Sequence, residues 1–177
     1  NLLLPLSVGA EISFVESLKT IGENMREVAP SIVIGVPLLL EKMHARLVKG
    51  LRRHWLAAGM LRLGLGRPVR RRLFQTLGGR LRFFIVGGAA SSPAILAGFE
   101  RLGIPILEGY GLTETAPVLT INPPGHPRIG SVGRPLPDAD IAIHEPHATG
   151  IREIQAPGPT VMPGHYRNPQ ATAAGMH

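Results

Sequence analysis

The 177-residue sequence contains no cysteine. Disulfide bonds and thiolate metal sites are therefore excluded, and the composition is consistent with the cytoplasm. No stretch approaches the ~18 consecutive apolar residues that a membrane-spanning helix needs. The first ten residues, NLLLPLSVGA, contain no basic residue, so we interpret them as part of the folded structure rather than as a signal peptide.

Two familiar kinds of site signal are also lacking. The glycine-rich motifs GxGxxG and GxxxxGK followed by Ser or Thr do not occur in full, although both are common in nucleotide-binding folds. His144, His147 and His165 lie among prolines without the spacing of metal ligands on a regular element. We therefore expect no metal site at these histidines.

Acidic residues are missing from one long segment. The chain has 19 Lys and Arg against 12 Asp and Glu, a formal net charge of +7. Residues 42–82 hold 12 of the basic residues and no acidic one, so the remainder has 7 basic and 12 acidic residues and is net negative. The excess positive charge is therefore a property of one segment.

Within this segment, Gly50 to Gly79 is helical in pattern, interrupted by glycine and proline, with arginines interleaved among leucines. Such a basic amphipathic stretch can be a solvated face, lie on an anionic membrane or bind nucleic acid. Peripheral membrane contact would run through Arg52 to Arg72. Nucleic acid is the least favoured partner because no aromatic platform or recognised binding motif accompanies the arginines.

The pattern that is present is that of a parallel α/β sheet, and it is clearest over Leu81 to Pro117. Phe83 to Val86 is a short apolar run closed by two glycines, which is typical of a strand buried on both faces. A helix should follow, with Ser91 or Ser92 as its cap, Pro93 in its first turn and Gly103 at its end. Ile104 to Leu107 is then a second buried strand.

An earlier part of the chain repeats this arrangement. Ser31 to Val36 is a β-branched run that predicts a buried strand, and Pro37 opens a helix with an apolar side. Gly9 to Val15 predicts a further strand, followed by a helix that Ser17 or Thr20 would cap and that runs to Val28. The fold class is therefore α/β, with a doubly wound, mostly parallel sheet.

From Asn122 the composition changes to proline and glycine, which favour loops and edge strands. Short strands are expected at Val132, at Ala139 to Ile143 and at Ile151 to Ala156, and turns from Val161 onward. We therefore divide the chain into an α/β subdomain, 1–122, and part of a small β-rich subdomain, 123–177.

The turns that follow the two strands of Leu81 to Pro117 should lie at the same carboxyl edge of the sheet, where open α/β sheets bind ligands. The second turn combines glycines, a tyrosine ring, threonine hydroxyls and carboxylates: Glu108, Gly109, Tyr110, Gly111, Thr113, Glu114 and Thr115. Glycines admit close approach of backbone amides, a ring can stack on a base, and a carboxylate can hold Mg²⁺. These are the parts of a nucleotide site.

The string GYGLTETAP, preceded by VGGAASSP, resembles the adenylate-forming (AMP-binding) enzyme superfamily, and most closely the long-chain fatty acyl-CoA synthetases. The resemblance extends over nearly the whole chain and implies the central part of the large N-terminal domain of such enzymes. It implies that ATP activates a fatty acid to an acyl-adenylate with release of pyrophosphate, and that coenzyme A then takes the acyl group. Mg²⁺ would assist.

The same resemblance implies roles for individual residues. The backbone of Gly88, Ala89 and Ala90 would pass the adenine edge, and Tyr110 would stack on the ring while Glu108 and Gly109 shape the turn. Thr113 would bind the α-phosphate and Glu114 would ligand Mg²⁺, which makes these two the catalytic candidates. The acyl pocket would be bordered by Gly111, Leu112, Ala116 and the turn from Gly130 to Gly133. The plain structural alternative makes Thr113 a helix cap with Glu114 in the first turn.

Other motifs of the superfamily are absent: the phosphate loop with its lysine, the Thr-Gly-Asp segment that holds the ribose, and the mobile domain with the catalytic lysine. We therefore expect a central piece of a longer enzyme that does not turn over alone, keeps weak adenine-nucleotide affinity, and self-associates through unpaired strand edges. Alternatives are a ligase for a medium-chain or aryl carboxylate, or a noncatalytic module that docks through the basic segment. The expected location is the cytoplasm, with possible contact at the inner face of a membrane.

Overall fold

The computed structural model describes residues 3–52, 66–144 and 152–176. Its helices are α1 (Leu3–Ser7), α2 (Ile21–Val28), α3 (Pro37–Arg52), α5 (Arg67–Thr76), α6 (Pro93–Leu102), the 3₁₀ turn η1 (Thr113–Thr115) and α7 (Pro169–Gly175). Its strands are β1 (Ile32–Gly35), β2 (Phe83–Val86), β3 (Ile106–Tyr110), β4 (Thr120–Ile121), β5 (Arg134–Pro135), β6 (Ala142–Ile143) and β7 (Ile154–Gln155). No helix in these ranges is long and apolar enough to cross a membrane.

Strands β1 to β5 form one sheet in sequence order, and β6 and β7 form a separate hairpin. The first three strands are parallel, with Phe84 opposite Val33 on one side and Ile106 on the other. Strands β4 and β5 extend the sheet antiparallel. The α/β class with a parallel sheet is confirmed, and the antiparallel extension is an addition that the sequence pattern did not predict.

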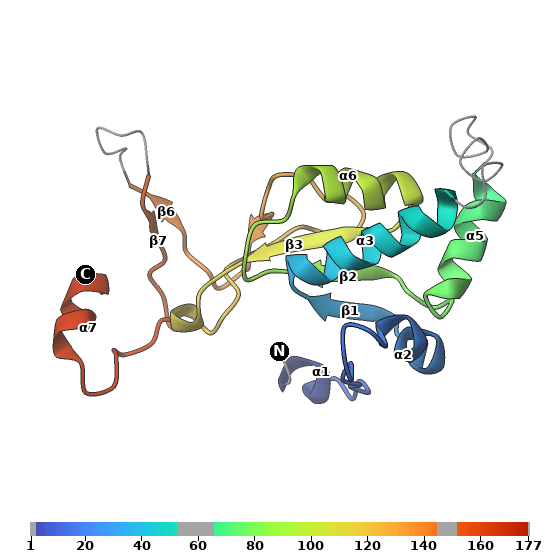
Figure 1. The fold of residues 1–177 in the computed structure, drawn as a ribbon. Coiled ribbons are helices and arrows are strands. Elements are labelled where there is room, and N and C mark those ends of the chain that lie inside the picture. Colours follow the sequence, from blue (N-terminus) through green and yellow to red (C-terminus); the bar gives the residue numbers. More distant parts are fainter. Residues whose placement is uncertain (1–2, 53–65, 145–151, 177) are drawn as a thin grey trace.

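Helices α3 and α6 cover one face of the parallel strands (Figure 1). The core between them contains Phe84 and Val86 of β2, Leu40 of α3 and Phe99 of α6, each at most 2% exposed. Burial of one such apolar side chain stabilises the fold by about 1.5–3 kcal/mol. This packing holds β2 and β3 in place, and with them the two turns at their carboxyl ends.

The opposite face of β1 is open. Side chains alternate across a strand, so Ile32 and Ile34 point away from Val33, which packs against the core. They are 41% and 46% exposed, and Val36 just beyond the strand is 54% exposed. Apolar β-branched side chains on an open sheet face, with β1 at the end of the described sheet, are a surface suited to contact with another chain or segment.

Proline and glycine residues in the sequence predicted several helix ends correctly. Pro37 and Pro93 begin α3 and α6, and Gly103 ends α6 in the left-handed conformation at φ 75°. Ser92 is the N-cap of α6 but makes no side-chain capping bond. The proposed cap at Ser91 is wrong, and its Oγ is buried without a hydrogen-bond partner among the described residues.

One strand prediction was wrong, and another strand has different bounds from those predicted. Gly9 to Val15 forms no strand; its apolar pattern is weak and Phe14 is 77% exposed, so no burial supports an extended segment. The strand predicted at Ile104 to Leu107 begins instead at Ile106, after Pro105, which has no N–H for a ladder. It continues to Tyr110 because Gly109 and Tyr110 pair with β4, so Glu108, Gly109 and Tyr110 belong to the strand rather than to a turn.

The C-terminal part differs most from its prediction. The segment predicted as turns contains α7, where the side chain of Asn168 accepts a hydrogen bond from the N–H of Ala171 at 3.0 Å. The strand expected at Val132 lies at Arg134–Pro135, whereas β6 and β7 fall within the predicted ranges; Ile151 lies outside the described residues. Strands β4 and β5 lie on either side of the predicted boundary at residue 122 and pair in one sheet. The division into two subdomains stays a prediction.

Within the basic segment, α5 confirms a helix at Arg67–Thr76 with Pro68 in its first turn. Arg53 and Arg62 lie outside the described residues, as does the side chain of Arg52.

Candidate functional site

The two predicted turns follow neighbouring strands. Val86 is opposite Glu108 in the parallel ladder, so the next residues, Gly87 and Gly109, adjoin each other. A Cβ added to Gly87 would lie 3.1 Å from the carbonyl oxygen of Gly109. The backbones are therefore in contact at this point, and the first turn leaves β2 beside the end of β3.

The first turn is accessible along its length. Gly88, Ala89 and Ala90 are all exposed, and Gly88 has the positive φ of 85° that only glycine adopts readily. A Cβ added to Gly88 would meet no atom within 4 Å. The backbone groups of these residues are thus available to a planar ligand.

The second turn folds back tightly on itself. Tyr110 is half-buried, and its carbonyl oxygen accepts a hydrogen bond from the N–H of Leu119 at 2.8 Å. A Cβ at Gly111 would collide with the carbonyl oxygen of Pro117, so the loop between them can close only around glycine. This closure holds the half-buried ring of Tyr110 at the end of β3.

Two threonines in η1 have opposite environments. Thr115 is 4% exposed; its Oγ1 accepts a hydrogen bond from the N–H of Leu112 at 3.1 Å and can donate to the carbonyl of Leu112 at 3.0 Å. Thr113 is exposed, and its hydroxyl makes no hydrogen bond to another described residue. The structural capping role therefore belongs to Thr115, which leaves the Thr113 hydroxyl available for a ligand.

Glu114 lies between these threonines and is half-buried. Its carbonyl oxygen accepts a hydrogen bond from the N–H of Met162 at 2.8 Å, which brings the C-terminal segment beside η1. Within the described ranges, no group of three or more His, Asp and Glu side chains could hold a metal ion. Mg²⁺ is commonly bound by one or two carboxylates plus substrate phosphates, and a single Glu114 fits that arrangement only with a nucleotide present.

The residues proposed to border an acyl chain form two groups. Leu112 is 47% exposed and Ala116 is exposed with φ 55°. The Gly130 to Gly133 turn is held against β4 by the hydroxyl of Thr120, which donates to the carbonyl of Val132 at 2.7 Å. A Cβ at Gly133 would collide with the backbone of Ile121. Close packing is thus sufficient to explain Gly133.

Sequence reasoning missed Asn122, which is 2% exposed. Its side-chain N–H groups donate to the carbonyls of Ser131 at 2.6 Å and Glu108 at 3.3 Å, and its Oδ1 accepts from the N–H of Arg128 at 3.0 Å. These hydrogen bonds connect strand β3 to the loop that follows β4. The one available signal was an amide placed between the β-branched end of β4 and two prolines.

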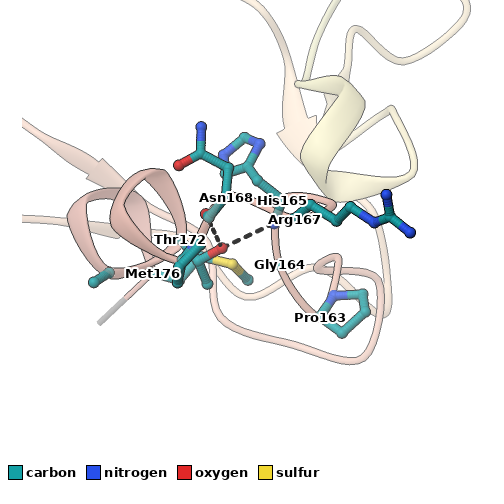
Figure 2. A pocket seen from close by; sticks show the side chains of 9 residues that line it. Pro163, Gly164, His165, Arg167, Asn168, Thr172 and Met176 are labelled. Atoms are coloured by element: carbon teal, nitrogen blue, oxygen red, sulfur yellow. Dashed lines mark hydrogen bonds between the residues drawn. The ribbon is translucent and has the colours of Figure 1, made fainter.

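A hollow of about 550 Å³ lies in the C-terminal segment, lined by Pro163, Gly164, His165, Arg167, Asn168, Pro169, Thr172, Ala173 and Met176. In Figure 2 the side chain of Arg167 extends away from α7, while Asn168 and Thr172 bond locally. Thr172 Oγ1 accepts from the N–H of His165 and can donate to the carbonyl of Asn168, both at 3.0 Å. Since these polar groups are already paired, we assign the hollow no ligand.

Comparison with known proteins gives a consistent result. The model of the family described as AMP-binding enzyme matches residues 1–166. The human long-chain-fatty-acid–CoA ligase 6 is 30% identical over 190 residues, covering 93% of this chain and 27% of that protein.

Among solved structures, an anthranilate CoA ligase in complex with anthranoyl-AMP has a TM-score of 0.73 at 18% identity, covering 98% of this chain and 31% of that one. A malonyl-CoA ligase ternary product complex with methylmalonyl-CoA and AMP has a TM-score of 0.70 at 23% identity, covering 97% and 34%. At these identities the likeness concerns the fold. The chain spans about a third of the length of these relatives or less.

Proposed function

Because this chain belongs to the AMP-binding enzyme family, we propose that it forms the adenine turn and part of the activation site of an AMP-forming acyl-CoA ligase. The observation that carries the proposal is that Gly87 and Gly109 are neighbours at the ends of paired strands. The accessible glycine-alanine turn therefore leaves the sheet beside the end of β3, which carries Tyr110 and leads to Thr113 and Glu114. As part of this proposal, the enzyme acts in the cytoplasm.

The chemistry assigned to these residues is electrostatic. An anionic carboxylate must attack an anionic α-phosphate, so charge has to be neutralised and the attack aligned. The unpaired hydroxyl of Thr113 would donate to the α-phosphate, and Glu114 would hold Mg²⁺ together with the phosphates. The ion would supply charge neutralisation on the nucleotide.

The adenine would lie between the backbone of Gly88 to Ala90 and the ring of Tyr110, with Glu108, Gly109, Gly111 and Leu112 shaping the second side. Exposure of the first turn and half-burial of the ring support this assignment. A stacked base gains from ring contact without hydrogen bonds, so substitution of the ring should matter more than loss of its hydroxyl.

For the carboxylate substrate we propose a long-chain fatty acid, with coenzyme A as the acyl acceptor. Support comes from the human relative, whose name specifies long-chain fatty acids and whose similarity covers 93% of the chain. The aryl and malonyl ligases among the structural neighbours make another carboxylate the alternative. A long tail would gain about 0.8 kcal/mol per buried methylene, so affinity for nonhydrolysable acyl-adenylate analogues should rise with acyl length and exceed that for a benzoyl analogue.

The experiment is a calorimetric titration of the 177-residue chain with ATP and Mg²⁺. We expect weak binding that Tyr110→Phe preserves and Tyr110→Ala reduces about tenfold, the effect of losing one stacked base contact of 1–3 kcal/mol. GTP serves as the matched ligand control. Equal affinity of the wild type and Tyr110→Ala for ATP would contradict the assignment.

A second measurement tests the expectation that the chain alone lacks turnover. Incubation with ATP, palmitate and coenzyme A should release no pyrophosphate, because the lysines and aspartate that the family uses elsewhere in its sequence are not in this chain. Release by the chain alone would refute that expectation.

A further inference from the structure

The amino-terminal edge of the sheet carries positive charge that the candidate nucleotide site does not use. Strands β1 to β3 are parallel and begin at this edge. Helices α5 and α6 end there because they return the chain to the starts of β2 and β3, and α3 runs toward the same edge (Figure 1). Figure 1 shows α5 at this end of the molecule, far from the carboxyl end of β3. The charged surface is therefore separate from the two turns described above.

Helix α5 directs arginines outward because its apolar side chains are buried. Leu73 is 8% exposed and Leu77, directly after the helix, is 4% exposed. At about 100° per residue, Arg67, Arg71 and Arg72 project from the other side of the helix, and all three are exposed. None of their guanidinium groups is bonded to another described residue.

Arg70 shows what a structural arginine looks like in the same helix. Its Nη2 donates to the carbonyl oxygen of Arg101 at 3.3 Å, and its side chain lies against Gly103. It therefore satisfies a carbonyl at the end of α6. Arg67, Arg71 and Arg72 make no such contact with any described residue, so nothing in the described structure pairs their charge.

Other exposed cations gather at the same edge. Lys49 is near the end of α3, and Arg80 and Arg82 directly precede β2. Among the described helix ends at this edge, acidic side chains are contributed by Glu27 of α2 and Glu100 of α6. The cations named here therefore outnumber these two carboxylates, in keeping with the absence of acidic residues from 42–82.

We propose that this basic surface, formed by Lys49, Arg67, Arg71, Arg72, Arg80 and Arg82, docks on an anionic lipid membrane. Attraction to an anionic membrane needs only clustered cations, and each Lys or Arg near the membrane raises the partition coefficient about fivefold. Single-stranded nucleic acid is normally held by aromatic side chains as well as by cations. Among the described residues, the single aromatic contact of these six cations is that of Arg82 with the half-buried ring of Phe83, with 5.9 Å from Cζ to the ring centre. The described part of the surface therefore favours lipid.

The test is flotation of the 177-residue chain with phosphatidylcholine vesicles, with and without phosphatidylglycerol. We expect binding only to the anionic vesicles, and its loss at high salt, since exposed charges are screened. Replacing Arg67, Arg71 and Arg72 by glutamine should lower partitioning about 100-fold. The matched control replaces Arg128, Arg134 and Arg152, which are also exposed, and should retain binding apart from a smaller loss through net charge.

Equal partitioning of the two triple variants would overturn the proposal, as would binding of the wild type to neutral vesicles. Displacement of the chain from anionic vesicles by an oligonucleotide at equal phosphate concentration would identify the surface as a nucleic-acid site and also overturn it. Circular dichroism and the ATP titration on the variant that replaces Arg67, Arg71 and Arg72 separate this result from the proposed function. Both should match the wild type, because neither the fold nor the nucleotide affinity depends on these three side chains.

Discussion

Asn122 donates two hydrogen bonds to the carbonyl oxygen of Glu108, one from its backbone N–H at 2.9 Å and one from its side-chain amide at 3.3 Å. The contact joins the residue after β4 to the strand that ends in Tyr110. Because the same amide also donates to Ser131, one buried side chain fixes the distance between β3 and the loop that follows β4. Loss of the Asn122 hydrogen bonds should therefore change the position of β3 relative to this loop.

Replacement of Asn122 by alanine should lower the free energy of unfolding by about 2–3 kcal/mol, since buried carbonyl and N–H groups would lose their partners. Asn122→Asp keeps the acceptor for Arg128 but loses both side-chain donors, so it should also destabilise. Denaturant unfolding measures both. The control is Asn168→Ala, at the exposed cap of α7, and a larger effect there than at position 122 would contradict this account.

The paired threonines of η1 should separate binding from stability. Thr113→Ala should change unfolding by less than about 0.5 kcal/mol, as expected for an exposed side chain, while reducing ATP affinity severalfold. Thr115→Ala should cost about 1 kcal/mol because a buried cap is lost. If Thr113→Ala leaves the ATP affinity unchanged, the hydroxyl has no role in nucleotide binding.

Glu114→Gln should reduce the Mg²⁺ dependence of ATP binding. The carboxylate is the proposed protein ligand, whereas the carbonyl that bonds Met162 is unchanged by this substitution. We expect the enhancement of ATP affinity by Mg²⁺ to fall about tenfold, measured by titration with and without the ion. Glu153→Gln, exposed in the segment before β7, is the control and should behave as the wild type.

His44 on α3 fills the space that a side chain at Gly98 on α6 would require, and its ring centre lies 5.6 Å from that of Phe99, with the two ring planes tilted by 50°. Gly98→Ala should therefore destabilise by about 1–3 kcal/mol through overpacking, even though alanine favours helices. His44→Ala combined with Gly98→Ala should cost less than the sum of the two. Gly22→Ala, in a helical site with no atom within 4 Å, should be neutral or stabilising.

The open face of β1 should promote self-association of this chain. Sedimentation velocity should reveal a concentration-dependent shift to larger species, and Ile34→Lys should reduce it because the charge opposes burial of the exposed sheet face. Ile143→Lys, exposed in the separate β6–β7 hairpin, is the matched control. A monomer at all concentrations would contradict the prediction.

Much of the parallel unit was predictable because its signals are local. The apolar run Phe83 to Val86 forms β2 with the expected bounds, and Pro93 and Gly103 mark the ends of α6 through their restricted and permissive φ angles. Local signals failed where a distant partner decided the conformation. Tyr110 is a strand residue because Thr120 pairs with it, and no property of the intervening turn specifies that pairing.

The sequence by itself determined the strand-helix-strand unit, the residue types at its two carboxyl-end turns and the confinement of positive charge to one segment, because these depend on neighbours within a few positions. Only the tertiary structure decided that the hydroxyl of Thr113, and not that of Thr115, has no hydrogen bond to a described residue, and that Asn122 is hydrogen-bonded to β3. It also decided that Met162 is hydrogen-bonded to Glu114 and that the exposed arginines of α5 lie at the opposite edge of the sheet. The bonds of Asn122 to Glu108 and of Met162 to Glu114 join residues far apart in the chain and form only when the sheet is assembled. The bonds of Thr115 are local, but which threonine is buried depends on how η1 packs against the rest of the fold.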